Sequence, residues 1–152
     1  MIPSRPIIAA TVLALGAAAL WPVHAQPRRT RQVVVPARGT PLRQALLDAV
    51  RQHVGTKSQF KVAHLAVWDS VAFVRAGEVV PDDEGLQETD LFVEAFLERR
   101  GGRWTVRESW NLSTEPDGAS HDAFLRRVRA RRVALGLPAA LFPADLWEPL
   151  RP

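Results

Sequence analysis

The clearest periodic pattern in the chain is an amphipathic stretch over residues 41–54. Thr40 can cap the N-terminus of a helix, Pro41 suits its first turn, and Gly55 can adopt the left-handed conformation that ends it. At about 100° per residue, the apolar residues form one broad stripe and the charged residues lie elsewhere. The stripe comprises Leu42, Ala45, Leu46, Ala49, Val50 and His53. The pattern predicts a helix that packs on an apolar surface.

Four segments with the two-residue period of β-strands follow this helix. Asp69-Ser70 forms a turn signal between the first two segments. Gly101-Gly102 separates the last two, and its glycines permit a tight turn. We therefore expect two hairpins, built from residues 59–68, 71–76, 89–98 and 104–109.

The first of these strands changes parity in its middle. Phe60 and Val62 fall on one face of a regular strand, whereas Leu65 and Val67 fall on the other. A β-bulge inserts one extra residue and reverses the parity of everything after it. A bulge near Ala63-His64 would therefore bring all four apolar side chains to the same face of the sheet.

An acidic segment separates the two hairpins. Residues 77–88 contain proline, glycine and three consecutive acidic residues, a composition typical of a solvated loop. Five carboxylates crowd into nine residues here, and such a group could gather a hard cation. Their spacing matches no calcium loop, so we expect no metal site. The five are Asp82, Asp83, Glu84, Glu88 and Asp90.

A second helix is expected after a loop over residues 111–120. Ser120 can cap its N-terminus, and Gly136 can end it near Leu135. Residues 121–135 carry five closely spaced arginines around a narrow apolar stripe. We interpret this helix as a solvated surface helix, with contact to anionic lipid or to an acidic partner as the alternative. An apolar tail of Leu141, Phe142, Leu146 and Trp147 is expected to pack as a short turn against the body.

The order helix, hairpin, hairpin, helix predicts an α+β fold. We expect a four-stranded antiparallel sheet of two hairpins, with an N-terminal helix packed on one face and a C-terminal helix. The expected core under the first helix is Leu42, Leu46, Ala49, Val50, Val62, Leu65, Val67, Val74, Leu91, Val93, Leu97, Trp104 and Val106. Phe73, Phe92, Phe96 and Trp110 alternate to the opposite face, which something must cover. We favour the second helix and the tail as this cover, and a ligand or a partner subunit is the alternative.

The first 25 residues have the pattern of a secretory signal peptide. Arg5 supplies the positive start, an uncharged apolar run extends from Ile7 to Trp21, and Val23-His24-Ala25 precedes the cleavage point. The run is shorter than the roughly 20 apolar residues that span a bilayer. We expect a periplasmic or secreted product, divided into a signal peptide over 1–25, an extended arm over 26–39 and a single domain over 40–152.

The composition argues against a disulfide-stabilised protein, a thiol-dependent enzyme and a nucleic-acid-binding protein. The chain contains no cysteine, so it has neither disulfides nor a thiolate nucleophile. Loss of Arg5 with the leader leaves 19 of the 20 basic residues against 16 acidic ones, a net charge of +3. This excess is mild and scattered, whereas nucleic-acid binding normally needs a concentrated basic face. We expect no nucleic-acid partner.

No motif in the chain signals an enzyme. The sequence lacks a G-x-S-x-G elbow, an H-E-x-x-H zinc helix, a phosphate loop and a G-x-G-x-x-G fingerprint, so we expect no cofactor. Outside the leader, the histidines are His53, His64 and His121, and no spacing between them aims two imidazoles at one metal. We interpret His53 as a residue favoured at a helix C-terminus and His121 as part of a first helical turn. His64, near the expected bulge, could be aimed into a cavity.

Five short segments carry a similarity to known proteins. They are residues 42–51, Phe60-Lys61-Val62, and residues 72–76, 102–106 and 136–142. On these segments the chain resembles a group of small exported bacterial α+β proteins of unknown function. The resemblance implies export and the hairpin layout, and it supplies no catalytic residues. A helix on a curved antiparallel sheet also looks like the ketosteroid-isomerase-like cone, but a shared fold does not transfer an activity.

Two functions stay open at this point. The first is a non-enzymatic binding or interaction module whose partner is an envelope protein or a small apolar molecule. Its expected ligand or partner face comprises Phe73, Phe92, Phe96, Trp110 and His64. The second is a small cone-shaped ligand-binding protein or enzyme with a cavity between helix and sheet, in which His64 and either Asp69 or Asp90 would form an acid–base pair. The sequence does not indicate an oligomeric state.

Overall fold

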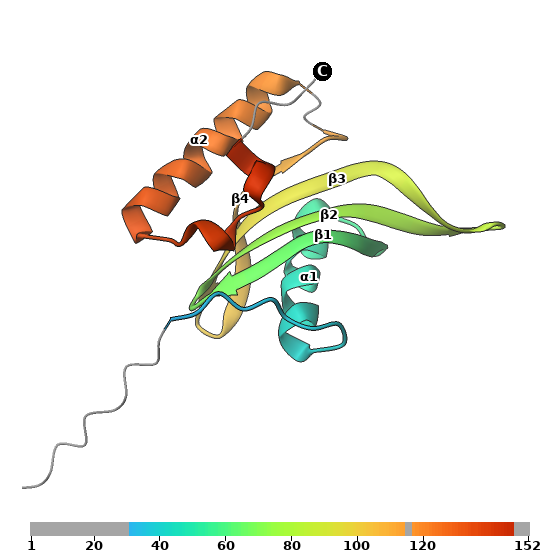
Figure 1. Ribbon diagram of the computed structural model, residues 1–152. Helices are drawn as coiled ribbons and strands as arrows, with labels where there is room; N and C mark the ends of the chain where they lie inside the picture. The colour runs from blue at the N-terminus through green and yellow to red at the C-terminus, as the bar shows by residue number, and fades with distance from the viewer. Residues whose placement is uncertain (1–30, 115–116, 148–152) are drawn as a thin grey trace, which may run out of the picture.

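Two helices cover the two faces of one antiparallel sheet in the computed structural model, which describes residues 31–114 and 117–147 (Figure 1). The elements are α1 (Pro41–Val54), β1 (Gln59–Trp68), β2 (Val71–Asp82), β3 (Gly85–Arg100), β4 (Arg103–Asn111) and α2 (Gly118–Leu135). Two 3-10 turns follow, Ala139–Leu141 and Ala144–Trp147, which we call the C-terminal turns. The strands form a meander in the order β1-β2-β3-β4, so the predicted α+β fold is confirmed. The leader expected over residues 1–25 lies outside the described residues.

The first helix has the predicted bounds because its end signals are local. The Thr40 side chain accepts the backbone N–H of Arg43 at 3.4 Å, and Pro41 occupies the first turn. Gly55 adopts φ +79°, and its N–H bonds the carbonyl of Arg51. No helix among the described residues is long and apolar enough to cross a membrane.

The predicted bulge in β1 is confirmed. The register between β1 and β2 shifts between Val62 and His64. As a result Phe60 and Val62, before the shift, and Leu65 and Val67, after it, all pack in the cluster under α1. One inserted residue thus reconciles two stretches of opposite parity.

The prediction of a loop over residues 77–88 is wrong. β2 continues to Asp82 and β3 begins at Gly85, and the pairs Val79–Glu88 and Pro81–Leu86 continue the ladder between them. This β2–β3 ribbon, Val79–Asp82 with Gly85–Glu88, extends beyond the rest of the sheet (Figure 1). Most of its side chains are exposed to solvent on both faces, so the strands here do not need the apolar alternation that reveals a half-buried strand.

The second helix begins earlier than predicted. Its N-cap is Asp117 rather than Ser120, and the Asp117 carboxylate accepts the backbone N–H of Ser120 at 2.6 Å. Aspartate and serine cap helices about equally well, and Asp117 comes first along the chain. The predicted end is confirmed, because Gly136 lies just after Leu135 with φ +60°.

Each face of the sheet carries its own apolar cluster. The first core lies under α1 and comprises Leu46, Leu47, Val50, Leu65, Val67, Ala72, Val74, Ala76, Val93, Ala95 and Leu97. Every predicted core residue belongs to it or packs against its edge except Leu91, which is half-buried and joins neither cluster. The second core lies under α2 and the C-terminal turns and comprises Ala66, Val71, Phe73, Phe96, Trp110, Phe124, Val128, Leu137, Leu141, Phe142 and Leu146.

Candidate functional site

The aromatic face expected to hold a ligand or partner is covered by the chain itself. Phe73 and Phe96 have no exposed surface, and Trp110 is 5 % exposed, whereas Phe92 is half-buried. Phe124 of α2 and Leu141 of the C-terminal turns fill the space above them. The cover that we favoured from the sequence, the second helix with the tail, is therefore confirmed. Three of the four aromatic residues have no surface free for a partner to contact.

His64 lies on this covered face and is held by the C-terminal turns. Its Nε2 atom is 3.0 Å from the carbonyl oxygen of Leu141. A carbonyl oxygen can only accept, so Nε2 is the protonated, donating nitrogen. Asp69 instead pairs with Arg31 at 3.5 Å, and neither Asp69 nor Asp90 has a hydrogen bond or ion pair with His64. The structure does not bring the proposed acid–base pair together.

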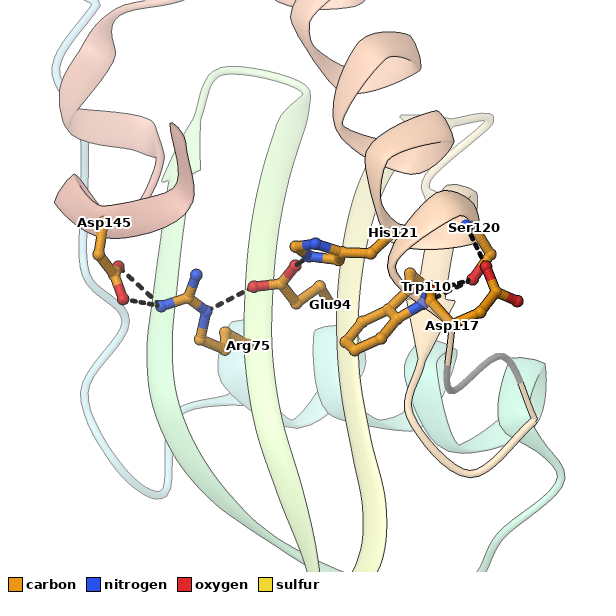
Figure 2. Close-up of polar contacts among 7 residues, drawn as sticks. All are labelled: Arg75, Glu94, Trp110, Asp117, Ser120, His121 and Asp145. Carbon is orange, nitrogen blue, oxygen red and sulfur yellow. Dashed lines mark hydrogen bonds and ion pairs between the residues drawn. The ribbon is translucent and has the colours of Figure 1, made fainter. Parts of the chain in front are cut away.

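A buried polar network crosses the second core (Figure 2). The Arg75 Nε atom donates to the Glu94 carboxylate at 2.7 Å, and its Nη1 atom donates to both oxygens of Asp145 at 2.7 and 2.8 Å. The other Glu94 oxygen lies 2.9 Å from His121 Nε2. Glu94 is only 2 % exposed and His121 only 4 %. Four charged or polar side chains from β2, β3, α2 and the C-terminal turns therefore form one chain of contacts.

Sequence reasoning missed this network, although one signal was present. Glu94 falls between Phe92 and Phe96 in the row of β3 residues that faces α2, so a carboxylate stands between two aromatic side chains. A buried charge needs a partner, so a carboxylate at this position indicates a cationic or hydrogen-bonding group packed against it. His121 packs against Trp110, with 4.4 Å between ring centroids, which places it inside the core rather than in a solvated first turn.

The network has the geometry of a clamp rather than of a catalytic centre. Its two innermost side chains are almost completely enclosed, so no substrate atom can approach them. The Trp110 Nε1 atom donates to the Ser120 hydroxyl at 3.1 Å beside it, which ties β4 to the first turn of α2 (Figure 2). Together these contacts fix α2 and the C-terminal turns on the sheet.

A serine and a histidine meet on the other side of the molecule. His53 Nε2 at the end of α1 lies 2.7 Å from the Ser109 hydroxyl on β4. Nucleophilic catalysis by such a pair requires a third group that orients the imidazole. Among the described residues no carboxylate forms a hydrogen bond or ion pair with His53. The contact joins α1 to β4 and does not form a triad.

The arginine-rich part of α2 is largely used within the chain. Arg127 and Arg131 donate to the Glu108 carboxylate at 2.8 and 2.7 Å. The guanidinium groups of Arg129 and Arg132 lie over the Trp147 ring, 5.2 and 5.8 Å from its centroid. These arginines bind β4 and the C-terminal turns, which agrees with a surface helix clamped to the body.

We expect acidic pH to lower the free energy of unfolding. Burial raises the pKa of Glu108, but the hydrogen bonds and charges of Arg131 and Arg127 outweigh it and hold the pKa below its usual 4.5. The pKa of Glu78 is also lowered, mainly by hydroxyl groups of Thr56 and Thr89. A lowered folded-state pKa contributes stability that is complete above the unfolded pKa and is lost as pH falls through the folded value.

We therefore expect Glu108→Gln to destabilise the protein at pH 7 and to have a much smaller effect at an acidic pH below the lowered pKa of Glu108, where this carboxyl group is protonated in both states. Urea unfolding followed by circular dichroism at the two pH values measures this difference. An equal loss of unfolding free energy at both pH values would show that the arginine pairs do not stabilise the carboxylate. Glu88→Gln, at an exposed ion pair with Lys61, is the control.

A groove of about 500 Å³ opens where α1, the start of β1 and the β2–β3 ribbon meet. Its apolar lining is Leu47, Phe60, Val62, Val79 and Leu86. Its polar lining is Arg38, Arg43, Gln59, Lys61 and Glu88. His64 is not among these residues. The groove thus lies between helix and sheet, as the second hypothesis expects of a cavity, but it is open at the sheet edge and lacks the histidine.

The charged side chains that line the groove are mostly cationic. Three cations and one carboxylate line it, and Lys61 already pairs with Glu88. Arg38 is exposed, and the described residues place no carboxylate in an ion pair with it or with Arg43. Leu86 is 60 % exposed and supplies apolar surface on the groove wall. The groove therefore combines an apolar surface with a net positive charge.

No protein-family model, curated protein or solved structure matches this chain. The resemblance to small exported bacterial proteins therefore stays a prediction. The described residues also contain no group of three or more histidine and acidic side chains that could hold a metal ion. The groove and the clamp are thus interpreted from their own geometry.

Proposed function

We propose that the protein is an exported, non-enzymatic binding domain whose ligand occupies the groove beside α1. The observation that carries this proposal is the groove itself, in which an apolar surface and unpaired cations lie together. Binding sites in proteins are typically concave and largely apolar, with a few polar groups that fix the orientation of the ligand. A ligand with an apolar body and an anionic group fits this combination.

The other features of the molecule support binding at this place. The aromatic face of the sheet is filled by α2 and the C-terminal turns, so it offers little surface to a ligand. The polar network is enclosed, and His53 with Ser109 lacks a third group. Apolar and charged side chains from the arm, α1, β1, β2 and β3 converge in the groove.

Export is the second part of the proposal and is supported by the leader pattern over residues 1–25. The envelope fraction or the medium is the expected location, and the partner is an envelope component. N-terminal sequencing of protein recovered from these fractions should begin at Gln26. Recovery of Met1 from the cytosol alone would contradict it.

The fluorescent anion 8-anilinonaphthalene-1-sulfonate (ANS) is a suitable probe for the groove, because it combines aromatic rings with one negative charge. We expect ANS fluorescence to rise on binding to the folded protein. Leu86→Asp places a charge on the apolar wall and Arg38→Glu reverses a rim charge, and each should weaken binding by about tenfold, equivalent to ~1.4 kcal/mol. Fluorescence titration measures both effects.

Matched controls come from α2. Val133 is 77 % exposed and Arg126 is exposed, so Val133→Asp and Arg126→Glu make the same changes away from the groove. They should leave ANS affinity within about twofold, or ~0.4 kcal/mol. If all four variants change the affinity equally, ANS binds elsewhere and the groove is not the site.

A further inference from the structure

The outer edge of β1 is paired over only part of its length. The arm that precedes α1 runs antiparallel to it, and Val34 and Val67 exchange two backbone hydrogen bonds of 2.8 Å. Among the described residues this is the one bridge between the arm and β1. The opposite edge of β1 is bonded to β2 throughout. An unpaired strand edge presents N–H and C=O groups that can pair with another extended chain.

Proline explains why the arm leaves the edge. In continued antiparallel register, Pro36 would lie opposite Leu65, the next residue of β1 whose backbone groups face outward. Proline has no N–H to donate, so the ladder cannot continue there. Instead, the Pro36 carbonyl accepts a hydrogen bond from Arg43 Nη1 at 3.2 Å, which directs the arm toward α1.

The groove reaches the part of β1 that the arm has left unpaired. Four consecutive β1 residues line it, Gln59, Phe60, Lys61 and Val62. Successive side chains of a strand point to opposite faces, so a groove lined by all four includes the edge of β1, and Val79, Leu86 and Glu88 extend it across the ends of β2 and β3. Arg38 lies beside it where the arm turns away.

We propose that the occupant of this groove is an extended peptide segment of a partner protein, which adds a strand to the outer edge of β1. The inference rests on the proposed function and names its ligand. Backbone hydrogen bonds would come from the edge of β1, and apolar side chains of the peptide would contact Leu47, Phe60 and Leu86. The added strand would continue, along the edge of β1, the backbone pairing that Val34 begins.

Charge complementarity indicates an acidic segment. Arg38 and Arg43 stand on the rim with no carboxylate in an ion pair, so an aspartate, a glutamate or a terminal carboxylate of the peptide would pair with them. Exposed lysine on an edge strand discourages pairing with another copy of the same edge, because it brings like charges together. Lys61 is such a residue, and it favours an acidic partner over a second copy of this chain.

Selection from a library of random octapeptides tests this inference on the purified, immobilised protein. We expect the recovered peptides to alternate apolar residues, to contain an acidic group and to displace ANS. Arg38→Glu should weaken them about tenfold, the equivalent of ~1.4 kcal/mol, and Arg126→Glu should not. Amide hydrogen exchange at Gln59–Val62 should slow on binding.

Backbone N-methylation of a recovered peptide provides the decisive readout. Alternate N–H groups of a strand face opposite edges, so methylating one alternate set should abolish binding, whereas methylating the other should preserve it. Equal binding of both sets would overturn strand addition. It would leave the groove as a site for side chains alone.

The remaining outcomes separate this inference from the proposed function. If Leu86→Asp weakens ANS binding but no selected peptide displaces ANS, the peptide inference is overturned. The ligand is then a small amphiphile. Sedimentation that shows a dimer dissociated by ANS would assign the groove to a second copy. If neither Leu86→Asp nor Arg38→Glu weakens the binding of ANS, both proposals are overturned.

Discussion

Replacing Glu94 with glutamine is expected to lower the free energy of unfolding by about 3 kcal/mol, the lower end of the range for breaking a buried ion pair. The substitution keeps the shape of the side chain and removes only its charge. Arg75, whose side chain is 16 % exposed, then loses its buried carboxylate and keeps only the exposed Asp145. His121 loses its charged acceptor at the same time. Urea unfolding measures the change.

A double-mutant cycle shows whether the loss comes from the pair. The cycle compares Arg75→Met, Glu94→Leu and the double variant. The double variant carries neither charge, so its loss of unfolding free energy should be smaller than the sum of the two single losses by at least about 1 kcal/mol. Glu88→Gln, which breaks the exposed pair with Lys61, should change stability by less than about 1 kcal/mol. A loss at Glu94 as small as that control would mean that the network does not clamp the layers.

Phe96→Ala is expected to destabilise the protein by about 4 kcal/mol. Phe96 has no exposed surface and lies in the second core between β3 and α2, so its truncation leaves a cavity that the surrounding structure fills only in part. Arg131 also lies over its ring, 5.9 Å from the centroid. Thermal and urea unfolding provide the measurement.

Val133→Ala is the matched truncation on α2, because Val133 is 77 % exposed. It should change stability by no more than about 0.5 kcal/mol. If Phe96→Ala costs as little as this control, then α2 and the C-terminal turns are not packed on the sheet. In that case the aromatic face would be open to a ligand, and it would be a better candidate for the binding site than the groove.

The sequence predicts those parts of the fold whose signals are local. Thr40 and Gly55 mark both ends of α1 within one turn of each boundary. The parity change between Val62 and Leu65 locates the bulge, because one face of β1 must bury all its apolar side chains. The β2–β3 ribbon escapes the same reasoning, since strands that are solvated on both faces carry no periodic signal.

The candidate site could not be predicted, because it depends on contacts between distant segments. Arg38 and Leu86 belong to different elements, and nothing in the sequence indicates that they line one groove. Glu94 and His121 are likewise brought together only by the packing of α2 on β3. The aromatic residues were predicted correctly as one face, but their neighbours in space come from the end of the described chain.

The position of the C-terminal turns imposes an order on folding. Leu141, Phe142 and Leu146, which complete the second core, follow all four strands of the sheet. While synthesis is under way, the sheet can bury its α1 side but must leave Phe73 and Phe96 in water, with Arg75 still lacking Asp145. The second core of a nascent chain therefore stays incomplete until residues 141–147 have been made, and holding chaperones can engage the exposed face during this interval.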